Sequence, residues 1–173
     1  MPITMYHGSV PVFLQLLPAL SGCLDKAQAF AEARKFDPTL FLSARLSPDM
    51  FPLSRQVQQA TAHACAPGRI AGVELPKFTD TGANIAELKQ RIATTVDFLK
   101  GIQPSQIEGK EDSQVTVQLC LNMRTFRAQV LLYHNALPNF YFHATTAYAI
   151  MRAAGVSLGK PDFLQHLGMP EQM

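Results

Sequence analysis

The segment that most constrains the fold runs from Ala136 to Gly155 and reads ALPNFYFHATTAYAIMRAAG. Its apolar residues recur at the spacing of a helix that buries one face: Ala136, Phe140, Ala144, Ala147 and Met151. His143 falls inside this stripe, so a polar ring is directed toward the core of a mostly apolar helix. Gly155 follows the last periodic residue and suits a helix C-cap. Any chemistry is therefore expected close to His143.

Three further segments show the same helical periodicity. They lie at residues 3–34, 52–66 and 84–100, each with apolar residues three and four positions apart. If the first of these helices begins after Ser9 as N-cap, Pro11 is tolerated in its first turn; if it begins earlier, Pro11 bends it. Pro138 lies inside the last helical segment, where it removes a backbone donor. We therefore predict a kink or a restart at Leu137–Pro138.

One segment alternates with a period of two instead. Val115, Val117, Leu119 and Leu121 are separated by Thr116, Gln118 and Cys120, which predicts a short strand. Asn122–Arg124 is then a suitable turn into a second strand near residues 125–127. We predict an all-α fold over residues 1–173, a four-helix bundle in one domain with a short β-hairpin before the last helix.

The overall composition excludes several classes of protein. The 173 residues carry a net charge of only +2 and no basic cluster, which argues against nucleic-acid binding. The apolar runs are too short for a membrane span, and the absence of a basic N-terminal region predicts a cytoplasmic protein. Catalytic patterns such as HExxH, a P-loop or CxxC are absent. Apolar residues on the first and last helices exceed what one core seam needs, which predicts a homodimer.

A family resemblance rests on particular stretches of the sequence. These are FPLSRQV, LPNFYFHATTAYAI, LGKPDF and the helix ending AIMRAAGV. With the four-helix pattern they resemble the DinB/YfiT-like superfamily, and within it a group of uncharacterised bacterial DinB-related proteins. The resemblance implies a DinB-like four-helix bundle. It also implies a divalent metal such as nickel or zinc, held by one histidine of the second helix and an HxxxH pair of the last helix. Some members are transferases or isomerases that use a low-molecular-weight thiol.

The metal ligands of the superfamily transfer to this chain only in part. Counting back from the MRAAGV ending places His143 at the second histidine of HxxxH and Asn139 at the first. Residues at i and i+4 share a helix face, but an asparagine carbonyl is a weak ligand for zinc or nickel. The second helix offers Gln56 or Gln59 where the resemblance implies a histidine, and His63 serves only if the register is shifted. The candidate metal residues are thus His143, Asn139 and Gln56, in a site that we expect to be degenerate.

Three interpretations of His143 remain open from the sequence. It is a core histidine that hydrogen-bonds Gln56 or a tyrosine, a metal ligand together with Asn139, Gln56, Asp49 and water, or a group that binds or protonates a ligand in a metal-free pocket. The first function hypothesis is a DinB-related binding or structural protein with a degenerate metal site. The alternative is a metal- or histidine-assisted transferase that acts on a small thiol or electrophile.

Overall fold

The computed structural model describes residues 3–119 and 121–164. Four long helices dominate it: α1 (Val10–Ala33), α3 (Leu53–Ala64), α5 (Ile85–Lys100) and α7 (Leu137–Ala153). The shorter helical elements are α2 (Leu40–Ser43), α4 (Ala66–Ala71), the 3₁₀ turn η1 (Pro104–Gln106), α6 (Ala128–Val130), the π-helix η2 (Leu131–Ala136) and α8 (Lys160–Leu164). The two strands are β1 (Gln114–Leu119) and β2 (Asn122–Arg127).

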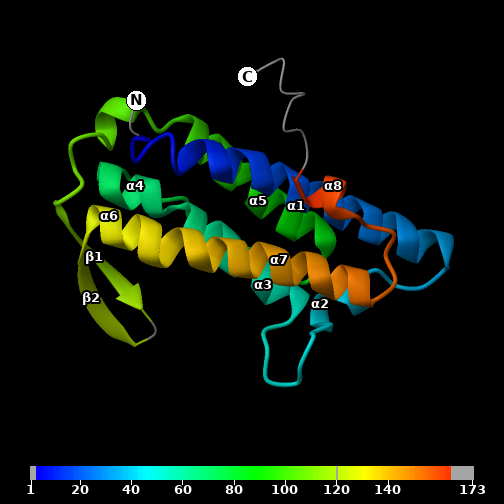
Figure 1. Cartoon of the computed structure of the whole chain (residues 1–173). Coiled ribbons are helices and arrows are strands. Elements are labelled where there is room, and N and C mark those ends of the chain that lie inside the picture. The colour runs from blue at the N-terminus through cyan, green and yellow to red at the C-terminus, as the bar shows by residue number, and fades with distance from the viewer. Residues whose placement is uncertain (1–2, 120, 165–173) are drawn as a thin grey trace, which may run out of the picture.

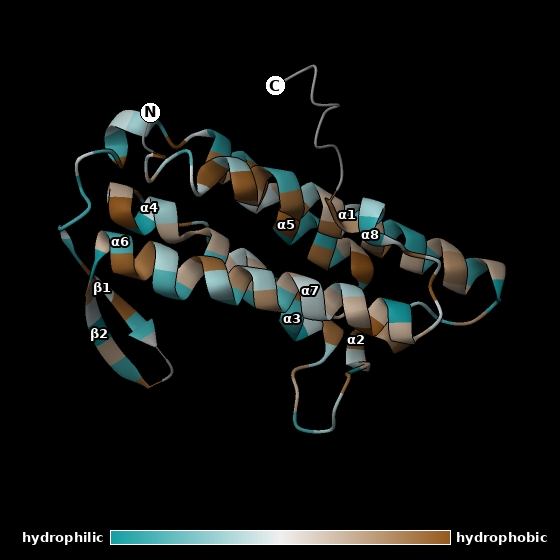
Figure 2. Cartoon of the chain, viewed as in Figure 1, coloured by the Kyte–Doolittle hydropathy of each residue, from teal (hydrophilic) through white to brown (hydrophobic). Residues whose placement is uncertain are grey.

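The long helices pack as two pairs. Helix α1 lies beside α5, and α3 lies beside α7, while α3 also contacts α5 and α1 contacts α7 (Figure 1). Hydrophilic and hydrophobic residues alternate along these helices (Figure 2), as expected when each buries one face. The largest side chains of the core include Phe13, Leu17, Leu20, Leu53, Leu88, Ile92, Phe140 and Ile150. The predicted all-α four-helix bundle with a hairpin before the last helix is confirmed.

Helix α1 begins after Ser9, so the interpretation in which Pro11 lies in the first turn is correct. The Ser9 hydroxyl does not cap the helix. It donates instead to the carbonyl of Met5 at 2.6 Å, within the turn that precedes α1. The helix is therefore shorter at its N-terminal end than the periodicity of residues 3–34 alone suggests, because the preceding residues form a separate turn.

Strands β1 and β2 form the predicted antiparallel hairpin, but its turn lies earlier than predicted. Leu119 pairs with Asn122, and Gln114 pairs with Arg127. Asn122–Arg124 therefore belongs to the second strand, and Leu121 lies in the connection with 94% of its surface exposed. The alternation of polar and apolar residues continues across such a tight connection, so the pattern alone does not mark where the chain reverses.

The last helix restarts at Leu137, as predicted from Pro138. Residues Leu131–Ala136 form a π-helix, and the N–H of Leu137 donates to the carbonyl of Leu132, five residues earlier. Pro138 then occupies the first turn of α7, where its missing N–H matters least. The wider π turn removes the clash that a proline makes with the preceding turn of an α-helix.

Two contacts position the elements that flank the bundle. Gly68 of α4 packs against Phe98 of α5 so closely that a Cβ atom there would lie 2.2 Å from the Phe98 ring, so any larger residue has to displace that ring. The tail helix α8 lies against α1, where Lys26 pairs with Asp162 at 2.6 Å and Gln15 donates to the carbonyl of Leu164.

Within the described residues, none of the helices combines the length and apolar character that a membrane span requires.

Candidate functional site

A cavity of about 720 Å³ opens between the α3–α4 segment and the η2–α7 segment, with strand β1 contributing one wall. Its apolar lining comes from Phe51, Ala62, Ala66, Val117, Leu131 and Ala136. Its polar lining comes from Arg55, Gln59, His63, Arg69, Gln118, Asn135, Asn139 and His143. The volume is that of a site for a small organic molecule, and the mixed lining is typical of one.

His143 is fixed by a chain of two hydrogen bonds. The side chain of Gln56 is buried and donates through Nε2 to the backbone carbonyl of Phe51 at 3.0 Å, which turns its Oε1 toward the imidazole. Oε1 lies 2.7 Å from His143 Nδ1, so Nδ1 carries the proton in this contact. The neutral ring consequently keeps its lone pair on Nε2. Burial, and then the charge of Arg55, lower the pKa of His143, which favours this neutral form.

His63 belongs to the same site. Its ring stacks on the His143 ring, with the centroids 5.7 Å apart and the planes 13° from parallel. Burial, followed by the charges of His143 and Arg69, lowers its pKa to about 4. In the described part of the chain His63 finds no hydrogen-bond or ion-pair partner. It is thus a neutral imidazole that lines the cavity, and neither ring nitrogen is hydrogen-bonded to a described residue.

Asn139 lines the cavity one turn before His143, where the sequence places it. Its Nδ2 donates to the backbone carbonyl of Asn135 at 2.8 Å, which leaves its Oδ1 as an acceptor. Asn135 is itself part of the lining, and its side-chain amide makes no hydrogen bond to other described residues. The π-helix thus ends next to two amide side chains that both face the cavity.

Two arginines give the cavity a positive character. Arg55 lies above the ring of Phe51, 5.7 Å from its centroid, and donates to Gln58 Oε1 at 3.3 Å. Arg69 is exposed and forms neither a hydrogen bond nor an ion pair with any residue that the structure describes. Among the lining residues of the described chain there is no Asp or Glu. The site therefore combines two cations with uncharged imidazoles and amides.

Of the candidate metal residues, the structure brings His143 and Asn139 to the cavity, and Gln56 contacts His143 Nδ1 without lining the cavity. Asp49, the further oxygen ligand considered, is an exposed residue whose Oδ1 accepts from Ser47 Oγ at 2.6 Å. It is neither a lining residue of the cavity nor the cap of α3, because the N-cap of that helix is Pro52.

The donor set fits a nickel or zinc ion poorly. Both polar atoms of Gln56 are engaged, with Phe51 and with His143. The imidazoles of His63 and His143 are stacked in nearly parallel planes, whereas two ligands of one ion direct their lone pairs to a common point. Over residues 3–119 and 121–164, no group of three or more His, Cys, Asp or Glu side chains is arranged to hold an ion.

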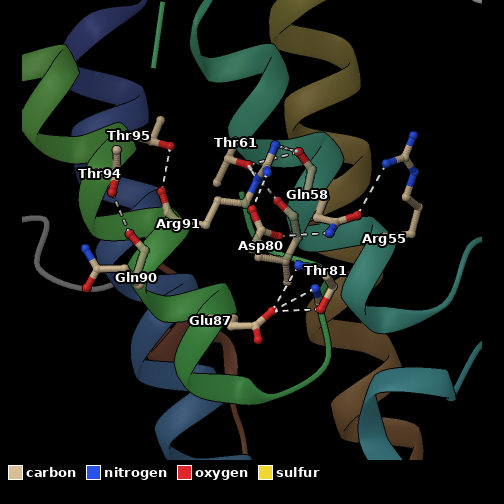
Figure 3. Close-up of polar contacts among 12 residues, drawn as sticks. Arg55, Gln58, Thr61, Asp80, Thr81, Glu87, Gln90, Arg91, Thr94 and Thr95 are labelled. Carbon is tan, nitrogen blue, oxygen red and sulfur yellow. Dashed lines mark hydrogen bonds and ion pairs between the residues drawn. The ribbon is translucent and has the colours of Figure 1, made fainter. Parts of the chain in front are cut away.

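A second polar cluster lies where α3 meets α5 and the loop before α5 (Figure 3). Asp80 and Arg91 form an ion pair at 2.6 Å, with only 8% and 11% of their side-chain surfaces exposed. Gln58 donates to the other Asp80 oxygen, and Arg91 Nε donates to Thr61 Oγ1. Burial alone would raise the pKa of Asp80, but the hydrogen bonds from Gln58 and Arg91 and the Arg91 charge outweigh it, so its pKa is lowered.

The same cluster fixes the loop to the start of α5. Glu87 Oε2 accepts from the backbone N–H of Thr81 (Figure 3) and also from those of Gly82 and Ala83. Asn84 caps the helix, since its Oδ1 accepts from the Glu87 N–H. In this cluster the side chains are paired with one another. It fastens the loop to the start of α5.

Sequence reasoning found His143, Gln56 and Asn139 but discounted His63 and did not identify the two arginines. The signal for His63 was available, because Gln56 and His63 are seven residues apart and thus fall on one face of a helix. Arg55 and Arg69 carried no such signal. Isolated basic residues on a helix are ordinarily solvated, and only the folded chain shows that they border a cavity.

Comparisons with known proteins agree with this architecture. Residues 5–164 match the family model described as "Domain of unknown function (DUF1993)". The chain is similar to a solved structure of a DinB family member protein from Shewanella denitrificans, with 34% sequence identity and a TM-score of 0.84. That similarity covers 95% of this chain and 93% of the other. A search of curated proteins finds no match. The chain therefore belongs to the DUF1993 family and is a member of the DinB/YfiT-like superfamily.

Proposed function

We propose that this protein binds a small organic molecule in the cavity beside His143, and that the metal site implied by its superfamily is degenerate. The observation that carries the proposal is the contrast between polar lining and polar pairing: His63 and Arg69 line the cavity without a hydrogen bond to described residues. Arg69 is exposed, and no buried side-chain nitrogen or oxygen of the described residues lacks a partner, so the unpaired donors of both side chains are open to a ligand that enters the cavity.

The binding experiment blocks the cavity and leaves the bundle intact. Ala62 lines the cavity and is half-buried, so Ala62→Phe fills the space, whereas Ala29→Phe adds the same ring on the exposed face of α1. With naphthalene-2-methanol as a fluorescent neutral probe, we expect saturable binding to the wild type and to Ala29→Phe, and its loss in Ala62→Phe. Equal binding to all three proteins would contradict the proposal.

Metal content tests the degenerate site separately. After dialysis against nickel or zinc, we expect elemental analysis to find far less than one ion per chain, because the described donors include no carboxylate and no thiolate. One ion per chain in the wild type that disappears in His143→Ala would show that the site is a working metal centre. The two metals are assayed separately because zinc accepts tetrahedral sites more readily than nickel.

A second candidate function is favoured by the fixed tautomer of His143. With Nδ1–H held by Gln56, Nε2 is free to accept a proton, as a general base requires. In a histidine-assisted transferase, Nε2 takes the proton of a small thiol, and the thiolate forms a bond to an electrophilic carbon as the leaving group departs. Glutathione with 1-chloro-2,4-dinitrobenzene tests this reaction; a rate above buffer that His143→Gln abolishes would favour the transferase.

We also propose that the protein is a homodimer. Large apolar side chains are exposed on α7 (Tyr141 and Phe142) and on the hairpin (Leu121 and Met123). Exposed apolar surface of this kind is a common basis for association. Light scattering is expected to give twice the monomer mass at micromolar concentration, and the monomer mass would contradict the proposal.

A further inference from the structure

We infer that the ligand of the cavity is an organic anion, whose negative group binds at the end of the cavity formed by Arg69, His63 and Asn135. This inference rests on the proposed binding function and adds the charge class and the orientation of the ligand. It requires no metal and no residue beyond those that line the cavity.

The side chains that line the cavity carry an excess of positive charge. Two guanidinium groups line it, and the described lining contains no carboxylate to neutralise them. The chain as a whole is nearly balanced, with 15 basic and 13 acidic residues, so this excess is local. A positive site with low-dielectric walls attracts anions and disfavours a divalent cation.

The two arginines differ in the partners that the protein already gives them, and this difference favours Arg69 as the one that binds the anion. Arg55 is already occupied, since it stacks on Phe51 and donates to Gln58. Arg69 has no such partner in the described chain, and its charge acts on His63, which lies on the same side of the cavity. A guanidinium without a carboxylate partner is the side chain best suited to a carboxylate or phosphate, which it binds through two parallel hydrogen bonds.

His63 and Asn135 supply further hydrogen-bond donors to the cavity. His63 in its neutral form has one N–H to donate, and the Asn135 amide has two, none of them used within the described residues. Helix α4 contacts the π-helix η2, which brings the Arg69 segment and the Asn135 segment to opposite walls. We therefore infer that Arg69, His63 and Asn135 present their donors to the same part of the cavity.

The rest of the cavity defines the body of the ligand. Phe51, Leu131 and Val117 provide apolar surface, and His143 and Asn139 offer an acceptor each, at Nε2 and Oδ1. The ligand class that matches is a small carboxylate or phosphate monoester with an apolar, preferably aromatic, body and a hydrogen-bond donor remote from the anion.

The experiment compares matched probes. Naphthalene-2-carboxylate and naphthalene-2-methanol have nearly the same shape but differ in charge at neutral pH, and both are followed by fluorescence anisotropy. We expect the carboxylate to bind the wild type about tenfold more tightly than the alcohol, a preference that falls as salt is raised. Inorganic phosphate is expected to compete with the carboxylate and not with the alcohol.

Two variants locate the anion. Arg69→Gln is expected to remove most of the preference for the carboxylate while leaving alcohol binding unchanged. Arg34→Gln removes the same charge at the end of α1, where Arg34 lies over the Phe30 ring, and is expected to keep the preference. Melting temperatures of both variants verify folding, which Arg69→Gln should not disturb because Arg69 is exposed and unbonded to described residues.

The outcomes separate this inference from the proposed function. Equal affinity for carboxylate and alcohol would overturn the anion inference and leave the binding cavity standing. A carboxylate preference that Arg34→Gln lowers as much as Arg69→Gln would overturn the assignment to Arg69. Binding of neither probe would overturn the proposed function, and the inference with it.

Discussion

Helix α3 carries polar side chains toward two different neighbours, and the two groups differ in how far the protein itself satisfies them. Gln58 and Thr61 meet Asp80 and Arg91, where each of the four is hydrogen-bonded within the cluster (Figure 3). On the cavity side, Gln56 is fully engaged, but His63 lines open space without a hydrogen bond to the described residues. On one face of α3, Gln58 and Thr61 are hydrogen-bonded within the protein, whereas on the other face His63 has no hydrogen bond to the described residues.

This difference separates polar groups that hold the fold together from polar groups that face the cavity. A buried ion pair with its hydrogen bonds made is costly to disturb. The half-buried His63 imidazole has no hydrogen bond to the described residues, so its removal is expected to cost the fold less. The comparison makes measurable predictions, because removing a side chain from either group should have very different effects on stability.

The largest effect is expected for Arg91→Met. The substitution leaves the Asp80 carboxylate, which is only 8% exposed, without its cation and removes the donor to Thr61. We expect a loss of about 3–5 kcal/mol in the free energy of unfolding, measured with urea. The double variant Asp80→Leu, Arg91→Met is the control and should recover most of this loss. An Arg91→Met protein as stable as the wild type would show that the Asp80–Arg91 cluster does not stabilise the fold.

A smaller effect on stability is expected for His143→Ala. His143 lines the cavity and also hydrogen-bonds the buried Gln56. The substitution leaves the buried Gln56 Oε1 without its donor and should cost on the order of 1–3 kcal/mol. Glutamine at position 143 restores a donor and should recover part of the stability while lacking the imidazole Nε2. If His143→Ala melts at the wild-type temperature and binds probes and metals unchanged, His143 has neither a structural nor a functional role.

The smallest effect is a pH dependence from His63. Its folded pKa of about 4 lies below the ordinary value of 6.5, so the unfolded chain takes up a proton first as pH falls. Stability is therefore complete above pH 6.5 and declines as pH falls toward 4, by on the order of 1 kcal/mol between pH 7.5 and 5.5. The pKa of His143 is lowered too and adds in the same direction. His63→Gln should flatten the profile, and an unchanged slope in that variant would show that His63 titrates as an exposed histidine.

Much of the fold follows from periodicity. The four long helices and the hairpin were predictable because each has a repeat that only one secondary structure satisfies. Pro138 correctly predicted where the last helix restarts. The π form of Leu131–Ala136 was not predictable, because a proline removes a backbone hydrogen bond but does not determine how the preceding turn adjusts. The turn at Leu121 was misplaced because hairpin connections preserve the alternation on either side.

His143 was predictable from its place on the apolar stripe of its helix. Asn139 and Gln56 were indicated by the resemblance, as the residues at the superfamily's other histidine positions. The positive charge of the cavity arises from Arg55 and Arg69, whose shared location depends on how α3 packs against α7 and how α4 packs against η2. That information is tertiary, and no local pattern contains it.

The π-helix has a consequence for the length of the chain. A π turn accommodates one residue more than an α turn, so η2 acts as an inserted residue within an otherwise α-helical run. Deleting one residue from 131–136 would close the run as an α-helix only with the Pro138 clash restored, and it would turn α6 and the hairpin by about 100° relative to α7. The hairpin precedes this point, so the deletion would swing strand β1 away from the cavity wall without changing any cavity side chain of α3 or α7. Single-residue insertions and deletions here would thus reshape the cavity entrance in one step, a route to new ligand preferences that point substitutions in the lining do not offer.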